Sequence, residues 1–137
     1  MVASRLDDPS VILIDARQAE EYTNGHIPGA INVDHLRNAA EVSTAQRTAE
    51  YLRSMFADVP VTSEKLWKSA GELRAMYADV GATSDKLVIS YCTTGVRSAV
   101  TYFSLKLIGY PNVLLYPGSW NEWSAHPELP VTKGDQP

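Results

Sequence analysis

Residues 87–108, LVISYCTTGVRSAVTYFSLKLI, join a strand-forming run to a helical run through one short loop. The apolar, β-branched run at 87–91 predicts a strand. A helix is expected from about residue 98 to residue 108, and Gly109 is expected to end it. The only cysteine of the chain, Cys92, lies between these two elements. Because functional loops of parallel α/β sheets lie beyond the carboxyl ends of strands, this stretch predicts both a fold class and a candidate site.

The rest of the sequence alternates between strand-forming and helix-forming segments. Three further strands are expected where short apolar runs lie between turn residues, at 11–14, 30–33 and 112–116. Helices are expected at 18–23, within 36–60, and from the capping box of Ser69 and Glu72 to Gly81. Strands that alternate with helices predict an α/β fold with a mainly parallel sheet.

The length and composition indicate one domain. A chain of 137 residues is long enough to bury a single core. We expect residues 1–137 to form one domain, with a helical insertion at 36–66 and a flexible tail at 132–137. Apolar residues make up 45% of the chain and charged residues 20%, which excludes a disordered or fibrous protein.

Charge and cysteine content narrow the class of partner. The net charge is −4 and no lysine- or arginine-rich run occurs, so neither nucleic acid nor an anionic membrane surface is expected as a partner. The chain has no apolar run of membrane-spanning length and no signal-peptide pattern, which predicts a cytoplasmic location. A single cysteine excludes an internal disulfide, a C-x-x-C redox pair and a cysteine-rich zinc site in this chain.

The loop after Cys92 has the residues of an anion-binding nest. Residues 93–97, TTGVR, offer consecutive backbone N–H groups and a glycine that permits a tight turn, next to a helix N-terminus. These groups and the guanidinium of Arg97 are expected to lower the pKa of Cys92 and make it a nucleophilic thiolate. The alternative is a structural cysteine that packs as a small apolar side chain at a strand end.

Residues 92–97, CTTGVR, resemble the C-x-x-G-x-R active-site loop of the rhodanese sulfurtransferases. The stretch 15–30, with DAR, EY and GHIPGA in turn, is similar to the amino-terminal signature of that family, and GSW at 118–120 with Trp123 resembles its carboxyl-terminal one. The three motifs occur in the order of the family. This resemblance implies a rhodanese-like fold, with a central five-stranded parallel sheet flanked by helices on both faces.

The resemblance also implies a sulfur-transfer chemistry. Cys92 is expected to attack the outer sulfur of a small anionic donor, such as thiosulfate, and to become a persulfide. Since the chain has no second cysteine, the acceptor is external: cyanide, a thiol or a partner protein. No metal and no organic cofactor are implied. The expected substrate-binding residues are Thr93, Thr94, Gly95, Val96 and Arg97.

Individual roles around the cysteine are less constrained by the sequence. Arg97, the last loop residue, is expected to bind the anionic end of the donor. Asp15 and Arg17 either orient the cysteine loop or form a structural ion pair. Trp120 and Trp123 either wall the pocket or pack as ordinary aromatic residues. His26 is expected to be a turn residue rather than a base.

The sequence leaves four alternatives to weigh: the donor, the function, the reaction class and the domain content of the full protein. Many thiosulfate-using members of the family have a basic residue directly after the cysteine, whereas this chain has Thr93, so 3-mercaptopyruvate is an alternative donor. A non-catalytic module that binds a partner or carries sulfur is the alternative function. Related phosphatases place five residues between cysteine and arginine, and this chain has four, which disfavours phosphatase activity. As a hypothesis, the chain is the catalytic half of a tandem protein with a second rhodanese domain.

Overall fold

Four parallel strands form the centre of the structure. The computed structural model describes residues 2–39 and 67–137. Its strands are β1 (Val11–Asp15), β2 (Ala30–Asn32), β3 (Leu87–Tyr91) and β4 (Val113–Leu115). They lie in the order β2-β1-β3-β4, and each neighbouring pair is parallel. The two longest apolar runs, β1 and β3, therefore occupy the centre of the sheet.

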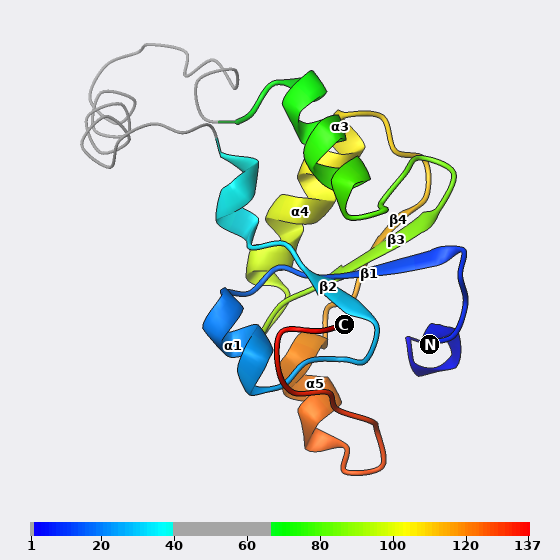
Figure 1. The fold of residues 1–137 in the computed structure, drawn as a ribbon, viewed down its shortest axis with the longest axis vertical. Coiled ribbons are helices and arrows are strands. Elements are labelled where there is room, and N and C mark those ends of the chain that lie inside the picture. Colours follow the sequence, from blue (N-terminus) through cyan, green and yellow to red (C-terminus); the bar gives the residue numbers. More distant parts are fainter. Residues whose placement is uncertain (1, 40–66) are drawn as a thin grey trace, which may run out of the picture.

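Helices cover both faces of this sheet (Figure 1). One face packs against α3 (Ala70–Asp79) and α4 (Val96–Leu107), and the other against α1 (Ala19–Asn24) and α5 (Ser119–Ala125). Two short 3-10 helices complete the described elements: η1 (Ala3–Arg5) and η2 (His35–Asn38).

The two central strands contribute side chains to two separate cores. Ile14 and Val88 pack with residues of α3 and α4, whereas Leu13 and Ile89 pack with Tyr22 of α1 and with α5. This division follows from the alternation of side chains along a strand. Because both faces are buried, the central strands are continuous apolar runs, which is typical of parallel sheets.

The structure confirms a parallel α/β sheet flanked by helices, but the expected number of strands is wrong. The described residues form four strands, not five. The number five came from the resemblance alone, whereas the described residues hold only four strand-forming runs, each of which became a strand. Of the helix expected within 36–60, residues 40–60 lie outside the described residues, and residues 35–38 form η2.

Two local features differ in detail from the sequence-based expectations. Helix α4 begins at Val96, two residues earlier than expected, because Gly95 takes a left-handed N-cap conformation. Thr132, in the expected flexible tail, pairs with His26, and the N–H of Gly134 donates to the carbonyl of Thr23 at 2.9 Å. No helix within the described ranges is both long and apolar enough to cross a membrane.

Candidate active site

Cys92 lies directly between the end of β3 and the start of α4. It is only 1% exposed, and the N–H of Gly95 points at its sulfur, with a distance of 3.1 Å from N to Sγ. Gly95 achieves this with a φ of 90°, in the left-handed region that favours glycine. The sequence therefore folds locally into a loop that curls back toward the thiol.

The surroundings of Cys92 favour its thiolate form. Burial acts to raise the pKa of Cys92, whereas hydrogen bonds from the backbone of Ser98, Thr94 and Gly95 and from the Ser98 side chain act to lower it. The hydrogen bonds outweigh burial, so the pKa of Cys92 is lowered from its ordinary value. A lowered pKa favours the thiolate, which is the nucleophilic form of a cysteine side chain.

The beginning of α5 fixes the backbone of the cysteine loop. The N–H of Cys92 donates to Oγ of Ser119 at 3.2 Å, and the carbonyl of Cys92 accepts from the N–H of Trp120 at 2.9 Å. The N–H of Asn121 donates to the carbonyl of Thr93 at 3.1 Å. Ser119 is fully buried and has a φ of 53°, a conformation uncommon for a residue other than glycine. The GSW motif thus holds the loop from the opposite side.

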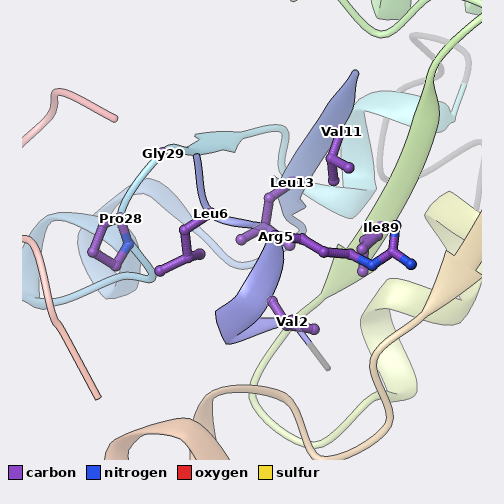
Figure 2. A pocket seen from close by; sticks show the side chains of 8 residues that line it. All are labelled: Val2, Arg5, Leu6, Val11, Leu13, Pro28, Gly29 and Ile89. Carbon is purple, nitrogen blue, oxygen red and sulfur yellow. The ribbon is translucent and has the colours of Figure 1, made fainter. Parts of the chain in front are cut away.

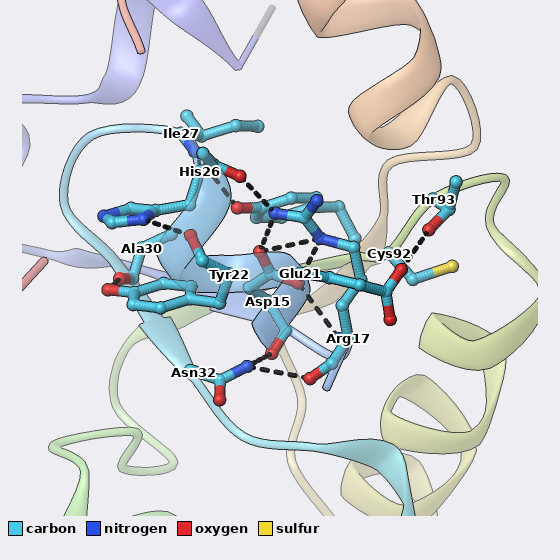
Figure 3. A network of polar contacts seen from close by, with 12 residues as sticks. Asp15, Arg17, Glu21, Tyr22, His26, Ile27, Ala30, Asn32, Cys92 and Thr93 are labelled. Carbon is cyan, nitrogen blue, oxygen red and sulfur yellow. Dashed lines mark hydrogen bonds and ion pairs between the residues drawn. The ribbon is translucent and has the colours of Figure 1, made fainter. Parts of the chain in front are cut away.

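Arg97 forms a paired ion bridge with Glu21 of α1. Nη1 and Nη2 of Arg97 lie 2.5 and 2.7 Å from the two carboxylate oxygens of Glu21. The hydroxyl of Thr93 accepts from Arg97 and donates to Glu21, which joins the three side chains into one network. Figure 3 shows the bond between Thr93 and Glu21 beside Cys92. The hydrogen bond from Arg97 is the main cause that lowers the pKa of Glu21 to about 2. Both partners are therefore charged at neutral pH.

Asp15 and Arg17 form a second ion pair, and this one is buried. Nη2 of Arg17 lies 2.6 Å from Oδ2 of Asp15 and also donates to the carbonyl of Gly25 at 2.8 Å. The guanidinium lies over the Trp120 ring, 4.7 Å from its centroid. The Asp15–Arg17 pair thus packs against Trp120, whose N–H donates to the Cys92 carbonyl.

Two candidates remain, the aromatic residue Trp123 and the imidazole residue His26. In the described structure, neither forms a hydrogen bond with Cys92. Trp123 is 1% exposed and packs in the core on the α5 side of the sheet. His26 is fully buried, stacks on Tyr22 with ring centroids 3.7 Å apart, and contacts the carbonyls of Tyr22 and Gln136. Its contacts are those of a residue that joins turns, and none of them involves Cys92.

The structure divides the predicted loop residues into two groups. Thr94 and Gly95 present backbone groups to the sulfur, whereas Val96 is 74% exposed in the first turn of α4 and contributes through its backbone position.

Three polar residues of the site had no role predicted from the sequence. These are Glu21, Ser98 and Ser119. Glu21 and Ser119 could have been indicated by their positions inside the family-like motifs, whereas Ser98 had no such signal.

Two cavities in the described structure lie elsewhere. A small one of about 20 Å³ lies between η1, β1 and the turn at Pro28 and Gly29 (Figure 2). A larger one of about 580 Å³ lies beside β4 and α5. Cys92 lines neither. In the part of the chain that the structure describes, no three His, Cys, Asp or Glu side chains are grouped to hold a metal ion.

Gly95→Ala should weaken the thiolate site. A Cβ at this position would lie 3.1 Å from the carbonyl oxygen of Pro117, and the φ of 90° would be strained by roughly 1–2 kcal/mol. We expect the N–H of residue 95 to shift from the sulfur and the pKa of Cys92 to rise. The pH dependence of Cys92 alkylation by iodoacetamide measures this. Gly71→Ala is the matched control, since a Cβ there meets nothing within 4 Å. An unchanged alkylation profile in Gly95→Ala would contradict the assigned role.

Comparison with known proteins identifies the family. The model of the rhodanese-like domain matches residues 1–126. The chain is 37% identical over 136 residues to a thiosulfate sulfurtransferase of Pseudomonas aeruginosa, and this match covers 93% of the chain and 42% of the relative. It is 35% identical to the sulfur carrier protein TtuD of Thermus thermophilus, over 90% of the chain and 42% of the relative. The chain thus spans about two fifths of the length of these curated relatives.

Solved structures show the same likeness. A variant of EanB in complex with ergothioneine superposes with a TM-score of 0.72 at 26% identity, covering 97% of this chain and 30% of that one. Another EanB structure, which holds a cysteine persulfide with ergothioneine, has a TM-score of 0.70 at 25% identity, with coverage of 96% and 30%. With the fold, the cysteine loop and the family match in agreement, the chain belongs to the rhodanese-like domain family.

Proposed function

We propose that this chain is a sulfurtransferase that moves a sulfur atom through a persulfide on Cys92. The observation that carries the proposal is the N–H of Gly95 directed at the Cys92 sulfur from 3.1 Å, in a loop whose hydrogen bonds lower the pKa of that thiol. The names of curated relatives, thiosulfate sulfurtransferase and 3-mercaptopyruvate sulfurtransferase, support the same reaction class.

The reaction consists of two displacements at sulfur. The Cys92 thiolate attacks the outer sulfur of thiosulfate, an S–S bond forms, and the S–S bond of the donor breaks with its electron pair leaving on sulfite. Backbone N–H groups of the loop hold the resulting anionic persulfide. Cyanide or a thiolate then attacks the outer sulfur, and the electron pair returns to Cys92. The persulfide form of EanB supports this intermediate in a related fold.

The acceptor has to come from outside the chain. The sequence contains one cysteine, so no second thiol of this chain can discharge the persulfide. Cyanide, a small thiol and a partner protein all meet this requirement. We propose the cytoplasm as the location of the reaction.

Intact-mass spectrometry tests the proposal. After incubation with thiosulfate, we expect Cys92 to gain one sulfur atom, and cyanide should remove it while thiocyanate and the original mass appear. 3-Mercaptopyruvate is tested in parallel, because curated relatives are named for both donors. Protein alkylated beforehand at its single cysteine is the control. If neither donor adds sulfur to unmodified protein, the proposal is wrong.

A sulfur carrier is the second candidate function, and the similarity to TtuD favours it. A carrier would accept one sulfur per chain and release it only to a specific partner protein. A sulfurtransferase would form many thiocyanate molecules per chain when thiosulfate and cyanide are both supplied. The number of thiocyanate molecules formed per Cys92 therefore distinguishes the two.

A further inference from the structure

Both arginines near the cysteine loop are already paired with carboxylates. Arg97 bonds to both oxygens of Glu21, at 2.5 and 2.7 Å, and Arg17 bonds to Asp15 in a buried pair. The sequence predicts that the positive charge of Arg97 binds the donor, but the carboxylate of Glu21 in α1 offsets this charge. A negatively charged donor that approaches Arg97 meets Glu21 as well.

The Glu21 contact with Arg97 is held by several groups at once. Thr93 donates its hydroxyl to Glu21 at 3.1 Å while it accepts from Arg97 at 2.5 Å. The Gln18 N–H also donates to Glu21 at 3.3 Å, as part of the capping box of α1. Glu21 is 37% exposed and Arg97 27%, so the pair borders solvent at the mouth of the loop. A donor can therefore reach the charges that this network balances.

We propose that Glu21 determines donor specificity by competing with anionic donors for Arg97, which disfavours doubly charged donors more than singly charged ones. This inference rests on the proposed function and adds a substrate class to it. Thiosulfate carries two negative charges at neutral pH, whereas 3-mercaptopyruvate carries one on its carboxylate. Repulsion by a nearby carboxylate increases with the charge of the donor. The site thus favours a singly charged donor.

Glu21→Gln isolates the charge from the structural role of this residue. Glutamine at the third helical position can still complete a capping box, so α1 is expected to remain folded. Glu20→Gln is the matched control, because Glu20 is the preceding residue of the same helix, is exposed, and changes the net charge by the same amount. Both variants can be compared with the wild-type chain under identical conditions.

Alkylation of the single cysteine measures the charge effect without any sulfur donor. Iodoacetate is anionic and iodoacetamide is neutral, and both react with the Cys92 thiolate by displacement of iodide. We expect the ratio of the iodoacetate rate to the iodoacetamide rate to rise about two- to fivefold in Glu21→Gln, the usual size of an exposed charge interaction. The ratio should stay at the wild-type value in Glu20→Gln, and the rise should shrink at high salt.

The outcomes separate this inference from the proposed function. An unchanged ratio in Glu21→Gln, or an equal rise in Glu20→Gln, overturns the inference, and a purely structural disturbance would slow both reagents together. In the sulfur-transfer assay, Glu21→Gln should lower the KM for thiosulfate more than that for 3-mercaptopyruvate. If the wild-type chain transfers no sulfur at all, the proposed function fails, while the alkylation ratio still decides the role of Glu21.

Discussion

Cys92→Ser is expected to abolish thiocyanate formation from thiosulfate and cyanide, by at least about a thousandfold. Serine keeps the size of the side chain and can accept the hydrogen bond from Gly95, now 3.1 Å from the sulfur. Its hydroxyl, however, has a far higher pKa than a thiol and cannot form a persulfide. The loss should therefore appear in turnover, with the fold retained.

Two measurements distinguish loss of chemistry from loss of structure. The midpoint of thermal unfolding should change little, because the substitution at this buried site is nearly isosteric. Mass spectrometry should show no added sulfur on the variant after incubation with thiosulfate. Comparable turnover in both proteins would show that another group carries the sulfur and would remove Cys92 from the mechanism.

Asp15→Asn is expected to reduce the free energy of unfolding by about 3–5 kcal/mol. Asp15 is fully buried and accepts hydrogen bonds from the backbone N–H, Nε and Nη2 of Arg17. The substitution leaves the guanidinium of Arg17 buried without a carboxylate, and the cost of an uncompensated buried charge is large. Urea unfolding gives the free energy directly.

The same substitution at an exposed site provides the control. Asp79→Asn, on the solvent side of α3, should change stability by no more than about 0.5 kcal/mol. A double variant, Asp15→Asn with Arg17→Met, should recover part of the loss because no unpaired charge remains. A loss below about 1 kcal/mol in Asp15→Asn would show that water or another group already compensates Arg17.

The strands, and the position of Cys92 in the loop between β3 and α4, could be predicted from the sequence because they depend on neighbouring residues. The runs at 11–14 and 87–91 became β1 and β3, since continuous apolar runs suit strands buried on both faces. The capping box of Ser69 and Glu72 forms at the start of α3. Helix α4 begins two residues earlier than predicted, because Gly95 is its N-cap with a φ of 90° and leaves Val96 as the first helical residue.

By itself, the sequence determined the α/β class, the family and the position of one cysteine between a strand and a helix, because these follow from local patterns and short motifs. Only the tertiary structure decided which charges meet around that cysteine. Arg97 pairs with a residue 76 positions away, and the N–H of Cys92 bonds to a hydroxyl 27 positions away. Such contacts depend on how α1 and α5 pack against the loop. Hydrogen bonds and ion pairs act over a few ångströms in space, whatever the separation along the chain.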